Sequence, residues 1–284
     1  MTPRKQRSRP IRYKRQGLVF PSLRDLDRRI GGEGALIDMI ELAVLNFIDQ
    51  AGKEDPKGYV ASLKMRHKVP SNFAELEKLQ GFASTLYLVS TINSVDRFLR
   101  DFRRDITNFR PRRDRGTKTM NALDGLLDLL PEASKKSCKG RPEYSLLTYY
   151  FNCRHYLVHA TSSELASDYE RLMQSCGKDI RELYRRSPNA PSSWTNGDRI
   201  LCLKALITFA DIINDHASLT PMEVALWMTT DEILLARLRA SGPRTRLRKV
   251  AAKYAAYQFE ADIRAADEIA AAIEGIIAKG WAAS

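Results

Sequence analysis

The longest stretch of helical periodicity runs from residue 71 to residue 109 and limits the chain to folds built around long helices. Within it, "FASTLYLVSTINSVDRFLRDF" has apolar residues at three- and four-residue spacing, which is the period of an α-helix. Ser71 is typical of an N-cap, and the Arg110-Pro111 step predicts the end of the helix. Because the middle is apolar nearly all round, we expect this helix to lie at the centre of a bundle.

The same spacing predicts helices over most of the remaining chain, and no segment alternates with period two for long enough to predict a strand. These helices span about 33–50, 118–130, 143–160, 164–186, 198–216, 221–240 and 244–280. Residues 53–70 and 131–142, which are polar and punctuated by proline, are predicted loops. The sequence therefore predicts an all-α fold, a helical bundle with a helical extension.

Three regions follow from composition. Residues 1–32 form a basic N-terminal arm, whose first 16 residues, "MTPRKQRSRPIRYKRQ", contain no acidic residue. Residues 33–186 form the bundle, and residues 198–284 form a C-terminal helical region that packs on it. The segment between the last two, "SPNAPSSWTNG", has the composition of a linker.

The charge of the chain favours a polyanionic partner. Lys and Arg number 46 against 34 Asp and Glu, for a net charge of +12, so nucleic acid is the first expectation and an anionic membrane surface the second. No apolar run approaches the ~20 residues of a membrane span, and the N-terminus lacks the apolar core of a secretory signal. Four cysteines without CxxC pairing indicate reduced thiols, so we expect a cytoplasmic protein.

The stretch "YYFNCRHYLVHA", residues 149–160, concentrates Arg154, His155 and His159 in an otherwise apolar helix. His155 and His159 lie four apart, as in zinc-binding helices, but the glutamate of the HExxH pattern is missing and no third ligand is evident except Glu164 nearby in sequence. A second interpretation is structural: a buried histidine hydrogen bond, and an arginine that caps a helix end or pairs with a carboxylate.

The third interpretation is RNA cleavage. RNA carries its own nucleophile, the 2′-hydroxyl, and its cleavage needs proton transfer and stabilisation of the phosphate charge. Histidine, with an unperturbed pKa of about 6.5, transfers protons near neutral pH, whereas arginine stays charged and its planar fork matches phosphate oxygens. On this hypothesis Arg154 binds the phosphate and His159 moves the proton, with no metal and no cofactor.

This stretch resembles the R-x4-6-H motif of the HEPN superfamily, with His155 at the polar position that often follows the arginine. The helix before it resembles the HEPN helix with an acidic residue inside an apolar run. Asp96 stands at the place often held by glutamate, followed by Phe98 and Leu99. The resemblance covers roughly residues 71–186, and aspartate shortens the acidic side chain relative to the family pattern.

The resemblance implies a metal-independent endoribonuclease of a toxin–antitoxin or anti-phage defence system, with a possible antitoxin or defence partner protein. It also implies a homodimer in which Arg154 and His159 from two chains line one cleft, with His155 and Asp96 as further candidate site residues. The sequence offers a set of basic side chains on and after the long helix as candidate RNA contacts. They are Arg97, Arg100, Arg103, Arg104, Arg110, Arg112, Arg113 and Arg115.

Two alternatives remain open at this point. One is a HEPN-like RNA-binding module without turnover. The other is a helical interaction or scaffold protein whose Ala-rich segment 244–280 packs against a partner helix. Other enzyme classes lack support, since GxxxxGK[ST], GxGxxG and GxSxG are all absent.

Overall fold

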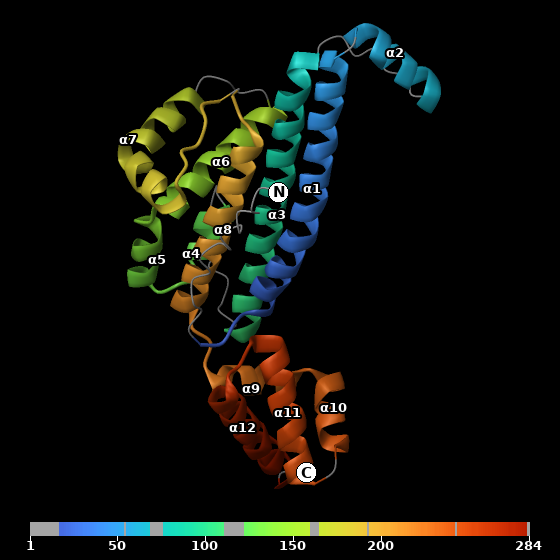
Figure 1. Cartoon of the computed structure of the whole chain (residues 1–284). Helices are drawn as coiled ribbons and strands as arrows, with labels where there is room; N and C mark the ends of the chain where they lie inside the picture. Colours follow the sequence, from blue (N-terminus) through green and yellow to red (C-terminus); the bar gives the residue numbers. More distant parts are fainter. Residues whose placement is uncertain are drawn as a thin grey trace, which may run out of the picture. The chain divides into compact units, whose positions relative to one another are not determined.

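The computed structural model describes residues 17–53, 55–68, 76–110, 122–159, 165–191, 193–241 and 243–282. These residues form twelve α-helices and no strand, apart from one isolated backbone bridge between Leu18 and Leu219 (Figure 1). The predicted all-α class is therefore confirmed. None of these helices has the length and apolarity needed to cross a membrane.

The helices are labelled as in Figure 1. In the first half of the chain they are α1 (Pro21–Lys53), α2 (Pro56–His67), α3 (Leu76–Phe109), α4 (Ala122–Leu127), α5 (Glu132–Lys139) and α6 (Pro142–His159). In the second half they are α7 (Leu165–Tyr184), α8 (Asn196–Ala217), α9 (Pro221–Thr230), α10 (Glu232–Ala240), α11 (Arg244–Phe259) and α12 (Ile263–Ala282).

The chain divides into two compact units, each assembled from segments distant in sequence. Unit 1 consists of Met1–Asp27, Asp96–Gly140 and Ile207–Ser284, and unit 2 of Arg28–Val95 and Arg141–Leu206. Helices α1, α3 and α8 each contribute residues to both units. Three of the four boundaries between the units thus fall inside helices, and the fourth lies between α5 and α6.

Unit 2 has an apolar core drawn from α3, α6, α7 and α8. Its buried side chains include Leu88, Ile92, Leu146, Leu147, Tyr150, Cys153, Ile180, Leu201 and Ala205. Polar pairs connect α1 to its neighbours: the Ser94 hydroxyl donates to Glu33 at 2.6 Å, and the buried Arg199 guanidinium meets Asp38 at 2.5 Å. Since Arg199 is almost fully buried, the loss of Asp38 would leave a desolvated charge.

Unit 1 is organised around aromatic rings from four parts of the chain. The Phe20 ring lies 4.8 Å from Phe102 and 5.6 Å from Phe109, and Phe109 also contacts Trp227 and Phe259. Backbone atoms fix the segment before α1 as well, since the Val19 amide donates to the Phe259 carbonyl at 2.9 Å. Large rings of this kind contribute much apolar area and prefer tilted or edge-on contacts.

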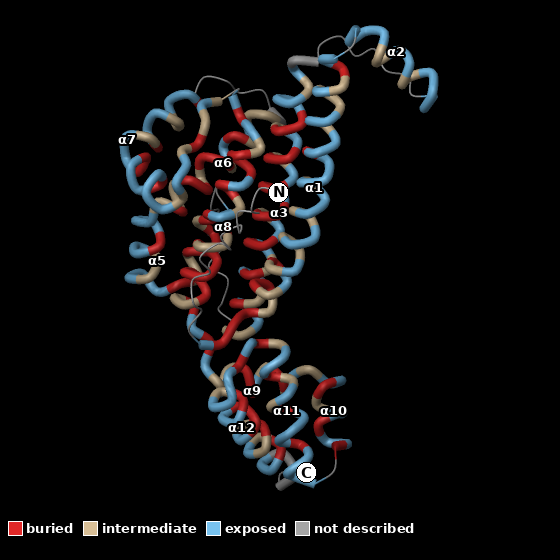
Figure 2. Tube along the Cα trace, viewed as in Figure 1, coloured by how far each residue is buried: buried red, intermediate tan, exposed pale blue. Residues whose placement is uncertain are grey.

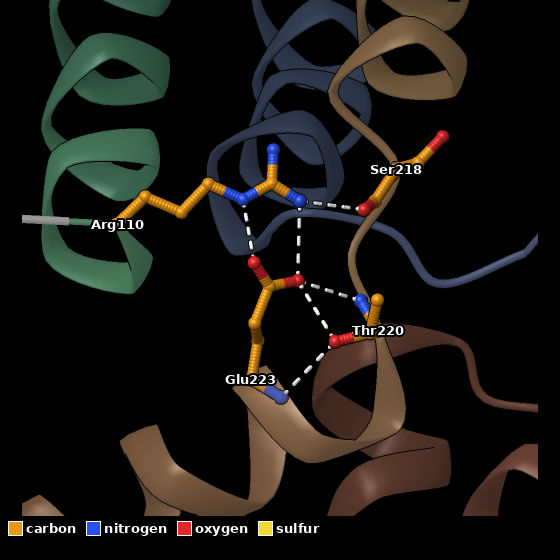
Figure 3. Close-up of polar contacts among 4 residues, drawn as sticks. All are labelled: Arg110, Ser218, Thr220 and Glu223. Atoms are coloured by element: carbon orange, nitrogen blue, oxygen red, sulfur yellow. Dashed lines mark hydrogen bonds and ion pairs between the residues drawn. The ribbon is translucent and has the colours of Figure 1, made fainter.

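An ion pair joins the end of α3 to the beginning of α9 within unit 1 (Figure 3). Arg110 Nε lies 2.6 Å from one oxygen of Glu223, and Arg110 also donates to the Ser218 carbonyl at 2.7 Å. Glu223 and Thr220 form a capping box at the start of α9, in which each side chain accepts the other residue's backbone N–H. Arg110 is therefore engaged in the fold.

Two predicted loops contain helices. Segment 53–70 holds α2, because Asp55 caps the helix and Pro56 occupies its first turn, a position that suits proline. Segment 131–142 holds α5, which begins directly after Pro131. In both places proline starts a helix, whereas the sequence interpretation took it as a break.

Other helix boundaries also differ from the predictions. Helix α1 begins at Pro21, so part of the predicted arm 1–32 is helical, while residues 1–16 lie outside the described residues. The predicted helix 221–240 is divided at Asp231, whose side chain accepts from the Leu234 amide and caps α10. The predicted helix 244–280 is divided after Phe259, where Glu260 has a left-handed backbone with φ of 51°.

Candidate functional site

The C-terminal half of α6 carries the arginine and the two histidines of the sequence motif. The helix is held in unit 2 by the buried side chains of Leu146, Leu147, Tyr150 and Cys153. Arg154 follows Tyr150 by four residues and Leu147 by seven, so it leaves α6 on the buried side of the helix. It is accordingly only partly exposed.

The guanidinium of Arg154 has no partner among the described residues. No ion pair or hydrogen bond joins its guanidinium to another side chain in the part of the chain that the structure describes. A partly buried guanidinium usually finds a carboxylate to offset its lost hydration. A carboxylate or a phosphate would equally offset the lost hydration of this guanidinium.

His155 is exposed, and His159 is the last residue of α6. The two positions lie one helical turn apart, whereas residues 154 and 159 differ by about 140° around the helix axis. The side chain of His159 lies outside the described part of the structure. The predicted helix around the motif is confirmed from its beginning to residue 159.

A buried hydrogen-bond network fixes α6 one turn before Arg154. The Tyr150 hydroxyl donates to Asp198 at 3.2 Å, and Asp198 is 1% exposed. The same carboxylate accepts the backbone amides of Asn189 and Thr195, both at 2.9 Å. Burial, and then the charge of Asp198, raise the pKa of Tyr150 well above its ordinary value, so the phenol stays protonated and keeps α6 tied to the α7–α8 connection.

A partly open cavity of about 180 Å³, lined by both apolar and polar side chains, lies between α6 and α7. Asn152 donates to Asp168 at 2.8 Å, and Arg171 lies 3.4 Å from the other oxygen of that carboxylate. The rest of the lining comes from Tyr144, Ser145, Thr148, Tyr149, Leu172 and Ser175. Asn152 and Arg154 are about 200° apart around α6, so the cavity and the guanidinium occupy different faces of the helix.

Sequence reasoning missed this cavity, because Asn152 and Asp168 fit no motif and meet only through the packing of α6 on α7. No family model, curated protein or solved structure matches this chain. The HEPN resemblance thus rests on the motif residues of α3 and α6. Among the described residues, no group of three or more His, Cys, Asp and Glu side chains could hold a metal ion.

Asp96 and four of the candidate RNA-binding arginines lie on α3 in unit 1, whereas Arg154, His155 and His159 belong to unit 2. Asp96 is about one-quarter exposed and lies 3.4 Å from Arg100, one turn further along the helix. Asp101 pairs in the same way with Arg97 at 3.9 Å and Arg104 at 3.1 Å.

The arginines of α3 are therefore only partly neutralised, and each exposes about two-thirds or more of its side chain where it forms a pair. Arg103 is also exposed and has no carboxylate partner within the described residues. Arg112, Arg113 and Arg115 lie outside the described residues. Exposed pairs of this kind are weak, so the aspartates hold Arg97, Arg100 and Arg104 only loosely.

The four cysteines are free and buried. Burial raises the pKa of the Cys153 thiol, on the buried side of α6, to about 12, and raises that of Cys202 further. Because the thiolate is the reactive form, Cys153 and Cys202 pack as apolar groups in the fold.

Proposed function

We propose that this chain is a metal-independent endoribonuclease of the HEPN type, with Arg154 on the scissile phosphate and His159 in proton transfer. The observation that carries the proposal is Arg154 itself: a partly buried guanidinium without a carboxylate partner among the described residues, five positions before the end of α6. The net charge of +12 suits the same polyanionic substrate.

Cleavage of RNA by its own 2′-hydroxyl needs two proton-transfer groups and one fixed cation. A neutral imidazole takes the proton of the 2′-hydroxyl, whose oxygen then attacks the adjacent phosphorus. The bond from phosphorus to the 5′-oxygen breaks, and an imidazolium gives that oxygen its proton. The products are a 2′,3′-cyclic phosphate and a 5′-hydroxyl, while Arg154 stabilises the charge on the phosphate oxygens throughout.

The two imidazoles come from two sources in this proposal. His159 supplies one, and either His155 of the same chain or His159 of a second copy supplies the other. A homodimer with a composite cleft is the arrangement that the family resemblance favours. Asp96, which pairs with Arg100, is a further candidate site residue with an acidic role.

Support for a dimer comes from an apolar face on unit 2, the unit that also holds the motif. Large apolar side chains stand exposed on α1 and the first part of α3, which are joined by the Ser94–Glu33 hydrogen bond. They are Leu36, Met39, Ile40, Leu42, Leu45, Phe82 and Leu86, each between 41% and 65% exposed. Pale blue dominates this stretch of α1 in Figure 2.

We expect the apolar face of α1 and α3 to bind the same face of a second copy of this chain. Asp38 is exposed near one end of this face, but from Met39 to Leu45 no exposed residue of α1 is charged, so this part of the face suits another apolar surface better than a phosphate backbone. A two-fold interface is self-complementary by construction, and contiguous exposed apolar side chains usually mark an interaction site.

Toxin or anti-phage defence is the setting that the resemblance implies, with a partner protein that restrains the activity. The alternative is RNA binding without turnover, which the exposed arginines of α3 would support equally well. Cleavage of the bound RNA separates these two candidates.

The test is incubation of the purified chain with tRNA and mRNA in the presence of EDTA, followed by analysis of the RNA ends. We expect fragments ending in 2′,3′-cyclic phosphate, and we expect R154A and H159A each to lose them. R66A and H67A on α2, where both side chains are exposed, are the matched controls and should cleave as the native chain does. Salt-sensitive RNA binding with intact RNA in every reaction would establish the binding module.

A further inference from the structure

Helix α11 has a charge composition unlike the other helices of unit 1. Its sequence, "RTRLRKVAAKYAAYQF", contains five basic residues and no acidic one. The buried side is formed by Leu247, Ala251, Ala255 and Phe259, which pack the helix into unit 1. The basic residues therefore lie on the sides that remain.

Two of the five basic residues serve the fold. Arg244 and Arg248 lie one turn apart and share Glu274 of α12, with N–O distances of 3.6 and 2.5 Å. The shared carboxylate holds α11 to α12 and satisfies both guanidinium groups in part. Arg244 and Arg248 therefore have a structural role.

The other three basic residues form an exposed stripe. Arg246, Lys249 and Lys253 are exposed, and none of them has an ion-pair partner within the described residues. Residues 246 and 253 are seven apart and lie within about 20° of each other around the helix, and residue 249 lies within about 60° of them. The three cations thus follow one line along about 10 Å of helix.

An aromatic ring continues this stripe at the C-terminal end of α11. Tyr257, four residues after Lys253, is 64% exposed. The Arg24 guanidinium lies over one face of its ring, 3.8 Å from the centroid, and also donates to the Tyr257 carbonyl. Arg24 adds a fourth cation beside the ring and holds the ring in a fixed orientation.

We propose that Arg246, Lys249, Lys253 and Tyr257, called the α11 stripe, bind the backbone of single-stranded RNA. A line of cations with an aromatic side chain is the combination that single-stranded nucleic acid recognition uses, since the cations meet phosphates and the ring stacks on a base. An anionic membrane fits less well, because Val250 is the one other large apolar side chain exposed on this part of the helix, at 37%, and an interfacial helix needs a broad apolar face.

This inference rests on RNA as the substrate, as proposed above, and adds a second place where RNA is held. The α11 stripe belongs to unit 1 and Arg154 to unit 2. In this proposal the α11 stripe contributes to the affinity for RNA and to its salt dependence, whereas the residues of the motif in α6 carry out the cleavage.

The closing experiment measures binding apart from cleavage by using a short fluorescein-labelled 2′-O-methyl RNA, which lacks the nucleophilic hydroxyl. Fluorescence anisotropy gives the Kd of the full chain between 50 and 200 mM salt. The variant R246Q/K249Q/K253Q should lower the slope of log K against log salt by about two, at ~0.7 for each phosphate contact. The ratio of the native affinity to the variant affinity should then fall by roughly fifteenfold as the salt rises from 50 to 200 mM.

The matched control is K57Q/K64Q/R66Q, which removes three positive charges from α2, where no ion pair joins these residues to a described side chain. It should leave the slope near the native value. The charge-preserving variant R246K/K249R/K253R should bind as the native chain does, which shows that a loss in the glutamine variant reflects charge. Equal losses in the two glutamine variants, or no loss in the first, would overturn the α11 stripe.

Two further measurements distinguish RNA binding by the α11 stripe from membrane binding and from the proposed ribonuclease activity. Sedimentation with phosphatidylserine vesicles that depends on the α11 stripe, without RNA binding, would overturn it in favour of a membrane surface. Cleavage of unmodified tRNA by the native chain tests the proposed function independently. RNA binding that depends on the stripe, together with intact tRNA, would support the stripe and contradict the ribonuclease.

Discussion

Arg110 and Glu223 meet through two contacts, Nε to Oε1 at 2.6 Å and Nη2 to Oε2 at 3.1 Å, although 113 residues separate them in the chain. The hydrogen bonds from Arg110 lower the pKa of the Glu223 carboxyl, and its partial burial opposes this effect to a lesser degree. The same carboxylate caps α9 through Thr220. One side chain therefore connects two helices and begins one of them.

We expect E223Q to destabilise the chain by about 1–2 kcal/mol at pH 7, since it weakens charged hydrogen bonds at a site where solvent screening limits their strength. Because the pKa of Glu223 is lower in the folded chain than in the unfolded one, its stabilisation is present above the ordinary carboxyl pKa and is lost as the pH falls through the folded value. Urea unfolding over a series of pH values from 7 downward measures this: the native chain and E223Q should differ most at pH 7, and the difference should shrink as the pH falls below the ordinary carboxyl pKa. E232Q, at an exposed position on α10, is the control and should match the native chain throughout the series.

Tyr150 and Asp198 provide a second test of the fold around the motif. Y150F removes one hydrogen bond to a carboxylate that is already bound by other donors, so we expect a loss of about 1–2 kcal/mol. D198A leaves several buried donors without an acceptor and should cost clearly more. Thermal unfolding of both variants gives the comparison, and a D198A variant as stable as Y150F would show that the network does not hold α6.

The apolar face of α1 and α3 predicts the assembly. L45E/F82E places two charges on this face, and we expect the mass in solution, measured by light scattering, to fall from two chains to one. L183E, at a position on α7 that is 57% exposed, is the matched control and should leave the mass unchanged. A native chain that is monomeric at all concentrations would contradict the shared cleft.

Substitution of Asp96 tests a role in RNA cleavage apart from any role in stability. Its pair with Arg100 is exposed on the arginine side, so D96N should change the stability by less than about 0.5 kcal/mol. If Asp96 has the acidic role that the resemblance implies, the same variant should lower RNA cleavage, and D96E should retain it. Unchanged cleavage in D96N would remove Asp96 from the site and leave Arg154 and His159 in it.

The buried thiols predict a slow chemical reaction. Because the pKa of Cys153 is about 12 and all four cysteines are buried, the native chain should react with a disulfide reagent such as DTNB at pH 8 far more slowly than the chain in guanidinium chloride. Measuring thiol release under both conditions tests this, and rapid release from the folded chain would contradict the burial of these side chains.

The sequence predicted the long helices because apolar spacing over many turns records which face of a helix is buried. Helix α3 follows that pattern, and the bounds of α6 match the predicted helix 143–160 to within one residue, so the position of Arg154 near the end of α6 was predictable. Helix α2 buries no side chain, so it leaves no apolar period in the sequence, and Pro56, Gly58 and Pro70 in this segment indicated a loop. The cap formed by Asp55 and Pro56 was the available signal.

The contacts that position the candidate site were beyond sequence reasoning for a different reason. Tyr150 and Asp198 are 48 residues apart, and Asn152 and Asp168 are 16 apart on different helices. Each pair is chosen by the packing of helices, which no local pattern specifies. The predicted start of a helix at residue 221 was right, but nothing in the sequence indicated that Arg110 would bind Glu223.

Helix α2 also offers a practical opening. It has capped ends and not one buried side chain (Figure 2), so nothing in the cores of the two units depends on its presence. A fluorophore, an affinity tag or the new chain termini of a circular permutant can be introduced there, which makes α2 a handle for capturing this protein while the helices that carry the motif stay intact.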